Sequence, residues 1–157
     1  MITTTSKSRT QRLVYSGDPA VQPKPDTLAQ RRVVWERRQV LAVLADLPKG
    51  TGDEARLAAE QRAQAEVQTA AAPKVWLPAD ECSSTEGATV AQVRGLSWLE
   101  DQEAQALPAD KQILRVLELG LVELDGSTEV AKLFLADPRA ELVIPLYRAI
   151  CDLTWGN

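Results

Sequence analysis

Apolar residues recur at helical spacing soon after a polar N-terminal stretch. Between Leu28 and Leu44 their spacing fits 3.6 residues per turn, which predicts a helix over about residues 26–46. Thr27, with Gln three positions later, resembles a capping box at the start of that helix.

A second helical segment follows a loop that contains Gly-Thr-Gly. Residues 54–70, EARLAAEQRAQAEVQTA, are good helix formers but include few large apolar side chains. Such a helix has little to bury, so close alanine-rich packing or contact with another chain would explain it. We therefore predict a helical hairpin over residues 26–72.

Beyond residue 73 two short extended runs precede a series of helices. Lys74–Leu77 and Thr89–Arg94 are expected to pair as a small β element, because the second run alternates apolar and polar residues. Pro145 should kink or split the last helix, since it cannot donate an interior hydrogen bond. Residues 73–157 are thus predicted to form a small, mostly helical α+β domain. Its helices are Ser97–Ala106, Ala109–Val122, Ser127–Ala136 and a terminal one that starts at Asp137-Pro138.

The first 25 residues are rich in Thr, Ser, Lys, Arg and Pro. They cannot bury enough apolar surface to offset their ordering entropy, so residues 1–25 are predicted to be an extended arm. Its apolar cluster, Leu13, Val14 and Tyr15, is a candidate contact with a neighbouring subunit. The complete prediction is a mainly α fold: a small helical domain with a minor two-stranded β element and an extended N-terminal arm.

The chain contains no histidine. This excludes Ser-His and Cys-His nucleophiles, histidine general bases and the histidine-dependent metal sites. The Gly-Thr-Gly loop lacks the spacing of a phosphate-binding loop and follows no strand. Acidic clusters stand at predicted helix starts, where capping and the helix dipole explain them. Those acids are Glu100, Asp101, Glu103, Asp137 and Glu141.

Metal ligation and disulfide formation also lack a supporting pattern. Cys82 and Cys151 have no ligand-like spacing and are expected to be unpaired thiols, with one disulfide between them left open. Asp80, Glu81 and Glu86 lie near Cys82 in a loop without a fixed ligand spacing. We expect no catalytic, cofactor-binding or metal-ligating residues, and hence a protein that is not an enzyme.

The net charge of −4 conceals an asymmetry. Residues 1–62 carry eleven Lys/Arg against seven Asp/Glu, whereas residues 63–157 carry seven against fifteen. The arginines of the first helix fit a solvated face better than a phosphate-binding patch, because Glu36 interrupts them and no aromatic stacking platform accompanies them. On this helix the candidate partner-binding residues are Arg31, Arg32, Trp35 and Arg38.

No stretch approaches the roughly 20 consecutive apolar residues of a membrane span. The start, MITTTSKSRTQRL, also has no apolar block of the kind that directs secretion. We expect a soluble protein that is cytoplasmic when made and has no membrane partner.

The order of elements over residues 88–157 resembles a known family. The segment ATVAQVRGLS at 88–97 precedes an acidic helix, the apolar run 116–122 and the turn at Asp125-Gly126, and two further helices follow. This order resembles the tail assembly chaperones and related small tail proteins of bacteriophages, with the final helix departing at Pro145. The resemblance implies binding without catalysis, namely holding a tail tube or tape-measure protein in the bacterial cytoplasm or staying in the finished particle.

Two hypotheses for function follow. The first is a non-enzymatic structural or assembly protein of a phage or phage-like tail, which binds other protein subunits of the assembly; homo-oligomer formation is left open. The alternative is a small bacterial adaptor or regulatory domain that binds an acidic partner or nucleic acid through the Arg-rich first helix. The acidic net charge makes nucleic acid the less favoured partner.

Overall fold

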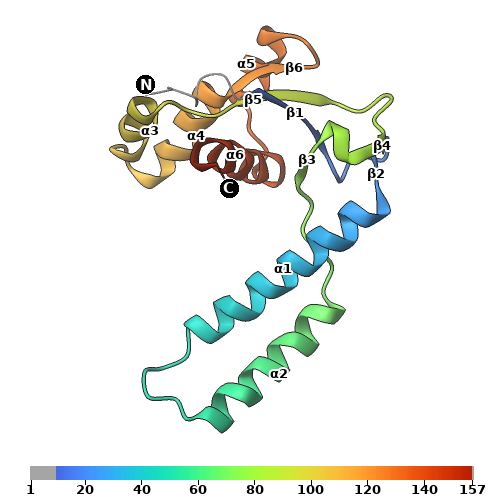
Figure 1. The fold of residues 1–157 in the computed structure, drawn as a ribbon. Coiled ribbons are helices and arrows are strands. Elements are labelled where there is room, and N and C mark those ends of the chain that lie inside the picture. Colours follow the sequence, from blue (N-terminus) through green and yellow to red (C-terminus); the bar gives the residue numbers. More distant parts are fainter. Residues whose placement is uncertain (1–9, 157) are drawn as a thin grey trace, which may run out of the picture. The chain divides into compact units, whose positions relative to one another are not determined.

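The computed structural model describes residues 10–156, and 59% of it is helical. The chain divides into two compact units (Figure 1). Residues 10–23 and 74–156 form one, which we call the sheet unit, and residues 24–73 form the other, the hairpin. The predicted helical character is confirmed, whereas the sheet is larger than expected.

The sheet unit contains a four-stranded antiparallel sheet in the order β3-β1-β5-β6. Val14 on the inner strand β1 stands opposite Leu77 on one side and Val90 on the other. The two runs expected to pair with each other are therefore separated by β1, and that part of the prediction is wrong. The strands are β1 (Thr10–Tyr15), β3 (Trp76–Pro78), β5 (Val90–Arg94) and β6 (Leu121–Leu124).

The predicted N-terminal arm is wrong for its described part. Leu13 and Val14 of β1 are 1% and 0% exposed. Because successive strand residues point to opposite faces, Leu13 packs in a large core cluster and Val14 in a smaller one. The short apolar run gave no hint of this, since both strands that pair with β1 lie far along the chain. Residues 1–9 of the predicted arm lie outside the described residues.

The smaller core cluster lies beside a second, two-stranded sheet. β2 (Gln22–Pro23) pairs with β4 (Cys82–Ser84), and the 3-10 turn η2 (Ala79–Glu81) precedes β4. Val21, Leu77 and Cys82 join Val14 in this cluster. The segment before the hairpin is thus fixed to the sheet unit by backbone pairing.

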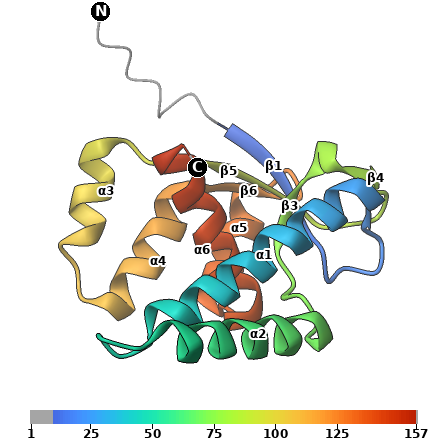
Figure 2. The same ribbon diagram turned by 60° about the horizontal axis from the view of Figure 1, so that its bottom comes forward.

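The larger cluster is formed by the sheet together with helices, of which α4 and α6 lie side by side (Figure 2). Leu117, Leu146 and Ile150 are essentially inaccessible to solvent. A Cβ at Gly120 would stand 2.5 Å from Cγ2 of Ile150, so glycine there permits the close approach of α6. The helices are α3 (Trp98–Gln105), α4 (Ala109–Gly120), α5 (Thr128–Ala136) and α6 (Ala140–Trp155).

Helix α6 continues through Pro145 and is not split. Proline leaves the carbonyl four residues earlier, that of Glu141, without its usual donor. The Tyr15 hydroxyl points to that oxygen at 3.5 Å, and Nε1 of Trp76 donates to the carbonyl of Leu142 at 2.9 Å. The Tyr15 hydroxyl from β1 thus faces the carbonyl that the proline leaves open, and the Trp76 indole from β3 binds the next carbonyl along the helix.

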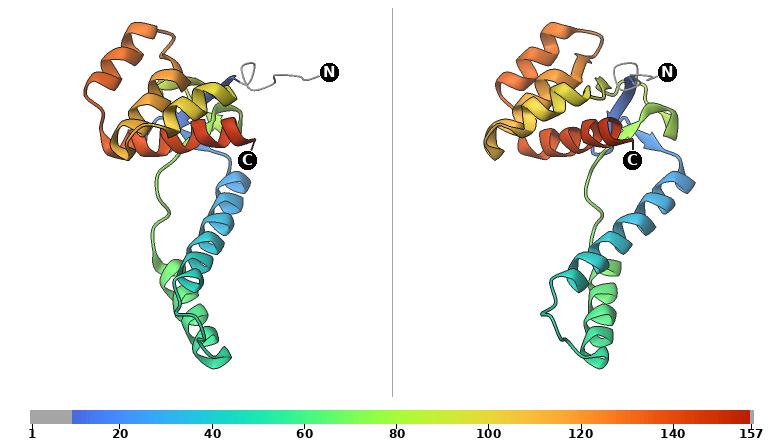
Figure 3. Two further views of the ribbon diagram at one scale, coloured as in Figure 1. Left: turned by 90° about the vertical axis from the view of Figure 1, so that its left-hand side faces the viewer. Right: turned by 60° about the vertical axis from the view of Figure 1, so that its left-hand side comes forward.

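The hairpin consists of α1 (Pro25–Ala45) and α2 (Asp53–Thr69), which run antiparallel (Figure 3). Pro25 occupies the first turn, where its missing N–H leaves no bond unmade. The predicted capping box at Thr27 is not used, because α1 begins before it. Across residues 10–156, no helix has the length and apolar character needed to cross a membrane.

Candidate protein-binding surface

The hairpin has very little core of its own. No residue of α1 is fully buried, and in α2 only Ala63 and Val67 are. Alanines at 59 and 63 leave α2 without the large side chains that would fill the space between two helices. The contact between α1 and α2 is therefore thin, as the composition of residues 54–70 predicts.

Arg32 provides the most extensive polar link between the two helices. Its Nε lies 2.6 Å from Oε1 of Glu36, and its Nη2 donates to the carbonyls of Val67 at 2.9 Å and Ala70 at 2.7 Å. Ala70 is the C-cap of α2, so the guanidinium satisfies carbonyls that the helix end leaves open and opposes its negative dipole end. Its Cζ also lies 4.9 Å from the ring centroid of Trp35.

The structure separates the candidate residues chosen from the sequence. Leu13 and Val14 are core residues of the sheet unit, and Tyr15 packs against Trp76 with ring centroids 5.6 Å apart. The assignment of Leu13 and Val14 to partner binding is corrected because both are buried, whereas that of the half-buried Tyr15 stays a prediction.

The four candidates on α1 also differ in role. Arg32, with Trp35 beside it, contacts the end of α2 within the same chain, and its role in partner binding stays a prediction. Arg31 is partly exposed and Arg38 is exposed. Of this set, Arg38 is the side chain that the structure leaves most open to a partner.

A groove of about 600 Å³ runs between α1 and α2. Its apolar lining includes Val33 and Leu41, which are 63% and 55% exposed. Large apolar side chains left open to water in one surface depression are typical of interaction sites. The apolar lining is Val33, Val40, Leu41, Leu44 and Val67, and the polar lining is Glu36, Arg37, Glu60, Gln64 and Gln68.

Further apolar side chains of the hairpin are exposed outside this lining. Leu28, Val34, Val43 and Leu57 are between 42% and 56% exposed. Burial of one such side chain contributes about 1.5–3 kcal/mol, so a partner that covers the groove has a substantial driving force available. The sequence alone does not identify these residues as a site, because the same apolar spacing is typical of a helix that faces an ordinary core.

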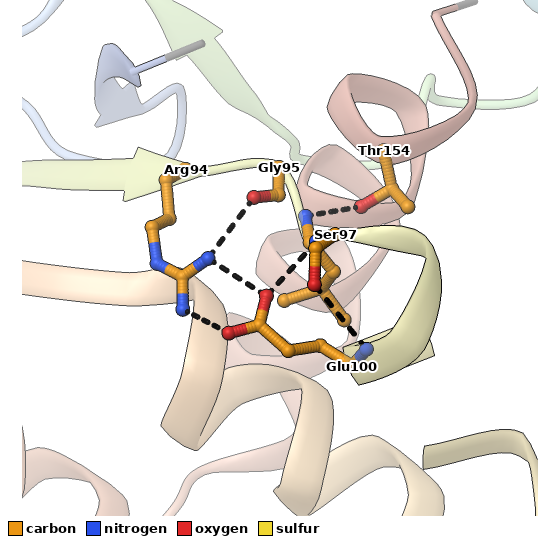
Figure 4. Close-up of polar contacts among 6 residues, drawn as sticks. Arg94, Gly95, Ser97, Glu100 and Thr154 are labelled. Carbon is orange, nitrogen blue, oxygen red and sulfur yellow. Dashed lines mark hydrogen bonds and ion pairs between the residues drawn. The ribbon is translucent and has the colours of Figure 1, made fainter. Parts of the chain in front are cut away.

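A cluster of polar side chains in the sheet unit caps the start of α3 (Figure 4). Ser97 caps the helix by accepting from the Glu100 N–H, and the Glu100 carboxylate accepts from the Ser97 N–H at 2.9 Å. Arg94 donates to both oxygens of that carboxylate, at 3.0 and 2.9 Å. These contacts lower the pKa of Glu100 to about 2, with the Arg94 hydrogen bond as the largest cause. Thr154 Oγ1 accepts from the Leu96 N–H and ties the same turn to α6.

A second group of ionisable side chains lies between α3 and α6. Burial raises the pKa of the Cys151 thiol, and Asp101 and Asp152 add to the rise while a hydrogen bond with Tyr147 opposes it. Burial also raises the pKa of Tyr147. Both groups are protonated near neutral pH, and a protonated thiol is a poor nucleophile.

Asp101 is 4% exposed, and its Oδ2 has no hydrogen-bond partner among the described residues. It stands in the first turn of α3, where the helix dipole stabilises a carboxylate. The part of the chain that the structure describes contains no group of three or more Asp, Glu or Cys side chains placed to hold a metal ion, and no disulfide joins Cys82 to Cys151.

Comparisons with protein-family models, with curated proteins and with solved structures found no match to this chain.

Proposed function

We propose that this protein is a non-enzymatic structural or assembly protein that acts through protein–protein contacts, with the hairpin groove as its contact surface. The observation that carries the proposal is the exposure of Val33 and Leu41 in the groove between α1 and α2. The lack of histidine in the sequence and the protonated state of Cys151 favour binding over catalysis.

A phage or phage-like tail is the assembly that we propose. The support is the resemblance over residues 88–157, whose order of elements corresponds to β5, α3, α4 and the turn after β6. Asp125 and Gly126 in that turn have φ values of 52° and 76°, which explains an aspartate-glycine pair there, since these residues adopt left-handed backbone most readily. The partners proposed on this basis are tail tube or tape-measure proteins.

Co-purification of the tagged chain with tail tube and tape-measure proteins, coexpressed in bacteria, tests this function. Val33→Asp with Leu41→Asp places two charges in the groove and is expected to abolish recovery of the partner. Leu133→Asp, on α5 of the sheet unit and 72% exposed, is the matched control and should leave recovery unchanged. Equal recovery with the groove variant and the wild type would remove the groove from the proposal.

The alternative, binding of nucleic acid or an acidic protein through the Arg-rich helix, has weaker support. The Arg32 guanidinium is engaged by Glu36 and by the end of α2, and α1 presents its remaining arginines beside exposed apolar residues. Phosphate-binding surfaces instead concentrate unpaired cations.

A further inference from the structure

The two helices that border the groove have opposite charge. α1 contains four arginines and two carboxylates, whereas α2 contains four carboxylates and two arginines. In the groove itself, Glu36 comes from α1 and is paired with Arg32. Arg37 also comes from α1, and Glu60 comes from α2. Neither residue forms an ion pair within residues 10–156, although Gln64 donates to Glu60 at 3.4 Å. The groove therefore presents a basic wall, an acidic wall and an apolar floor.

This distribution of charge selects among possible occupants. A helix with one predominant charge would be attracted by one wall and repelled by the other. A second copy of the same hairpin avoids that conflict, because a two-fold axis parallel to the helices places α1 of each copy beside α2 of the other. Such a surface is complementary to itself.

The size of the hairpin also suits this arrangement. At about 1.5 Å per residue, α2 is roughly 25 Å long, and two packed helices are roughly 20 Å wide. The face is thus about 500 Å² in projection on each copy, which reaches the roughly 1,000 Å² in total that a specific interface needs. Two such hairpins form a four-helix bundle, in which the apolar floor becomes a shared core.

We propose that the groove binds the groove of a second copy of this chain, so that α1 of each copy packs against α2 of the other. This inference rests on the proposed function, because it names the partner of the same surface. The apolar floor from Val33 to Leu44 is then covered by its counterpart, and Arg37 of one copy approaches the acidic wall of the other. The dimer is the unit that would enter a larger assembly.

Measurement of the mass of the full chain by light scattering during gel filtration tests the proposal. We expect twice the 17.2 kDa of the chain at micromolar concentration. Val33→Asp with Leu41→Asp should weaken association by more than about a hundredfold, since two apolar side chains lose their burial, and should elute as a monomer. Leu133→Asp should remain a dimer. A monomeric wild type, or a dimer that persists in the groove variant, would overturn the proposal.

A groove variant whose hairpin unfolds would also be monomeric, so hydrogen exchange of the wild type provides an independent test of the dimer. Backbone amides between residues 33 and 44 should exchange more slowly at high protein concentration than after dilution below the dissociation constant. Amides of β5 should exchange at the same rate in both conditions. Exchange over residues 33–44 that is independent of concentration would contradict the dimer.

A pair of charge-reversal variants tests whether α1 of one copy packs against α2 of the other. Arg37→Glu or Glu60→Arg alone gives like charges across the interface, and each is expected to weaken the homodimer roughly tenfold, because two symmetric contacts change sign. An equimolar mixture of the two variants restores opposite charges and should form heterodimers of near wild-type affinity. Failure of the mixture to recover affinity would contradict the packing of α1 against α2 of the partner.

These outcomes separate the dimer from the proposed function. If the wild type is monomeric while Val33→Asp with Leu41→Asp abolishes recovery of a tail protein, the inference fails and the function stands. If the groove variant is monomeric but still recovers the tail protein, the dimer stands and the groove is removed from the function.

Discussion

Arg32 is the residue that joins the two helices of the hairpin. Its contacts with Trp35 and Glu36 are local in sequence, whereas its contacts with the last carbonyls of α2 are 35 and 38 residues away. The sequence placed Arg32 among exposed arginines because a helical period alone does not show which face meets a second helix. Arg38, on the same helix, is the exposed residue of the set.

Substitution of Arg32 by alanine is therefore expected to loosen the hairpin. The carbonyls of Val67 and Ala70 lose their donor, and partial exposure limits the cost to about 1–2 kcal/mol. Hydrogen exchange of the last turn of α2 should accelerate accordingly. Arg38→Ala is the control, and equal acceleration in both variants would show that general charge, not the specific contact, is responsible.

Glu100 makes the stability of the sheet unit depend on pH. Its pKa falls from an ordinary 4.5 to about 2 in the folded protein because of the Arg94 hydrogen bond. A carboxyl with a depressed folded-state pKa stabilises the fold above its unfolded pKa, and this contribution is lost as the pH falls from about 4.5 to about 2.

Glu100→Gln is expected to remove this contribution. Because the pair with Arg94 is partly exposed, the loss should be on the order of 1–2 kcal/mol at pH 6. The difference in free energy of unfolding between wild type and variant should shrink toward pH 2, as measured by urea denaturation. Glu103→Gln on the same helix should show no comparable trend. A difference that stays constant with pH would contradict the role of the Arg94 contact.

At the scale of elements, local signals predicted helices well and strands poorly. Ser97 and Ser127 are N-caps as expected, and both accept a backbone hydrogen bond. Leu121 was assigned to the preceding helix, but Gly120 ends α4 and Leu121 begins β6. The partner of that strand, β5, is remote in sequence, and no local pattern identifies such a pairing.

The start of the last helix also differs from the prediction. Asp137-Pro138 has the sequence of a helix start, yet α6 begins at Ala140, and its N-cap Arg139 makes no side-chain cap. Around Pro145 the helix depends on contacts from Tyr15 of β1 and Trp76 of β3, which could not be foreseen without the tertiary structure.

Trp76→Phe tests that dependence. The variant retains an aromatic ring but removes the donor to the Leu142 carbonyl, which should cost about 1–3 kcal/mol. Thermal unfolding of the full chain measures the loss. Trp98→Phe, at a position 73% exposed, should change stability little. A loss no larger than that of Trp98→Phe would contradict the role of this hydrogen bond.

At the scale of the whole molecule, the hairpin is an insertion in the sheet unit. β2 ends at Pro23 and pairs with β4, while β3 begins at Trp76 and pairs with β1. The change in the sign of the net charge after residue 62 marks no boundary between the two units, since residue 62 lies within α2. Composition along the chain therefore located the hairpin but not the sheet unit. That unit combines the segments that precede and follow the hairpin in sequence.

Replacement of residues 24–73 by a short Gly/Ser linker is expected to leave the sheet unit folded. The cross-strand partners of β1 and β2 all lie outside the deleted segment, and the entropy of closing a loop changes only slowly with its length. Near-ultraviolet circular dichroism should retain the signal of the packed pair of Tyr15 and Trp76. The variant should be monomeric and should not recover a partner that binds through the groove. Loss of the tertiary signal would show that the sheet unit needs the hairpin to fold. Association that persists in the variant would instead place the interface on the sheet unit, and the exposed Trp98 and Trp155 would then be the residues to test.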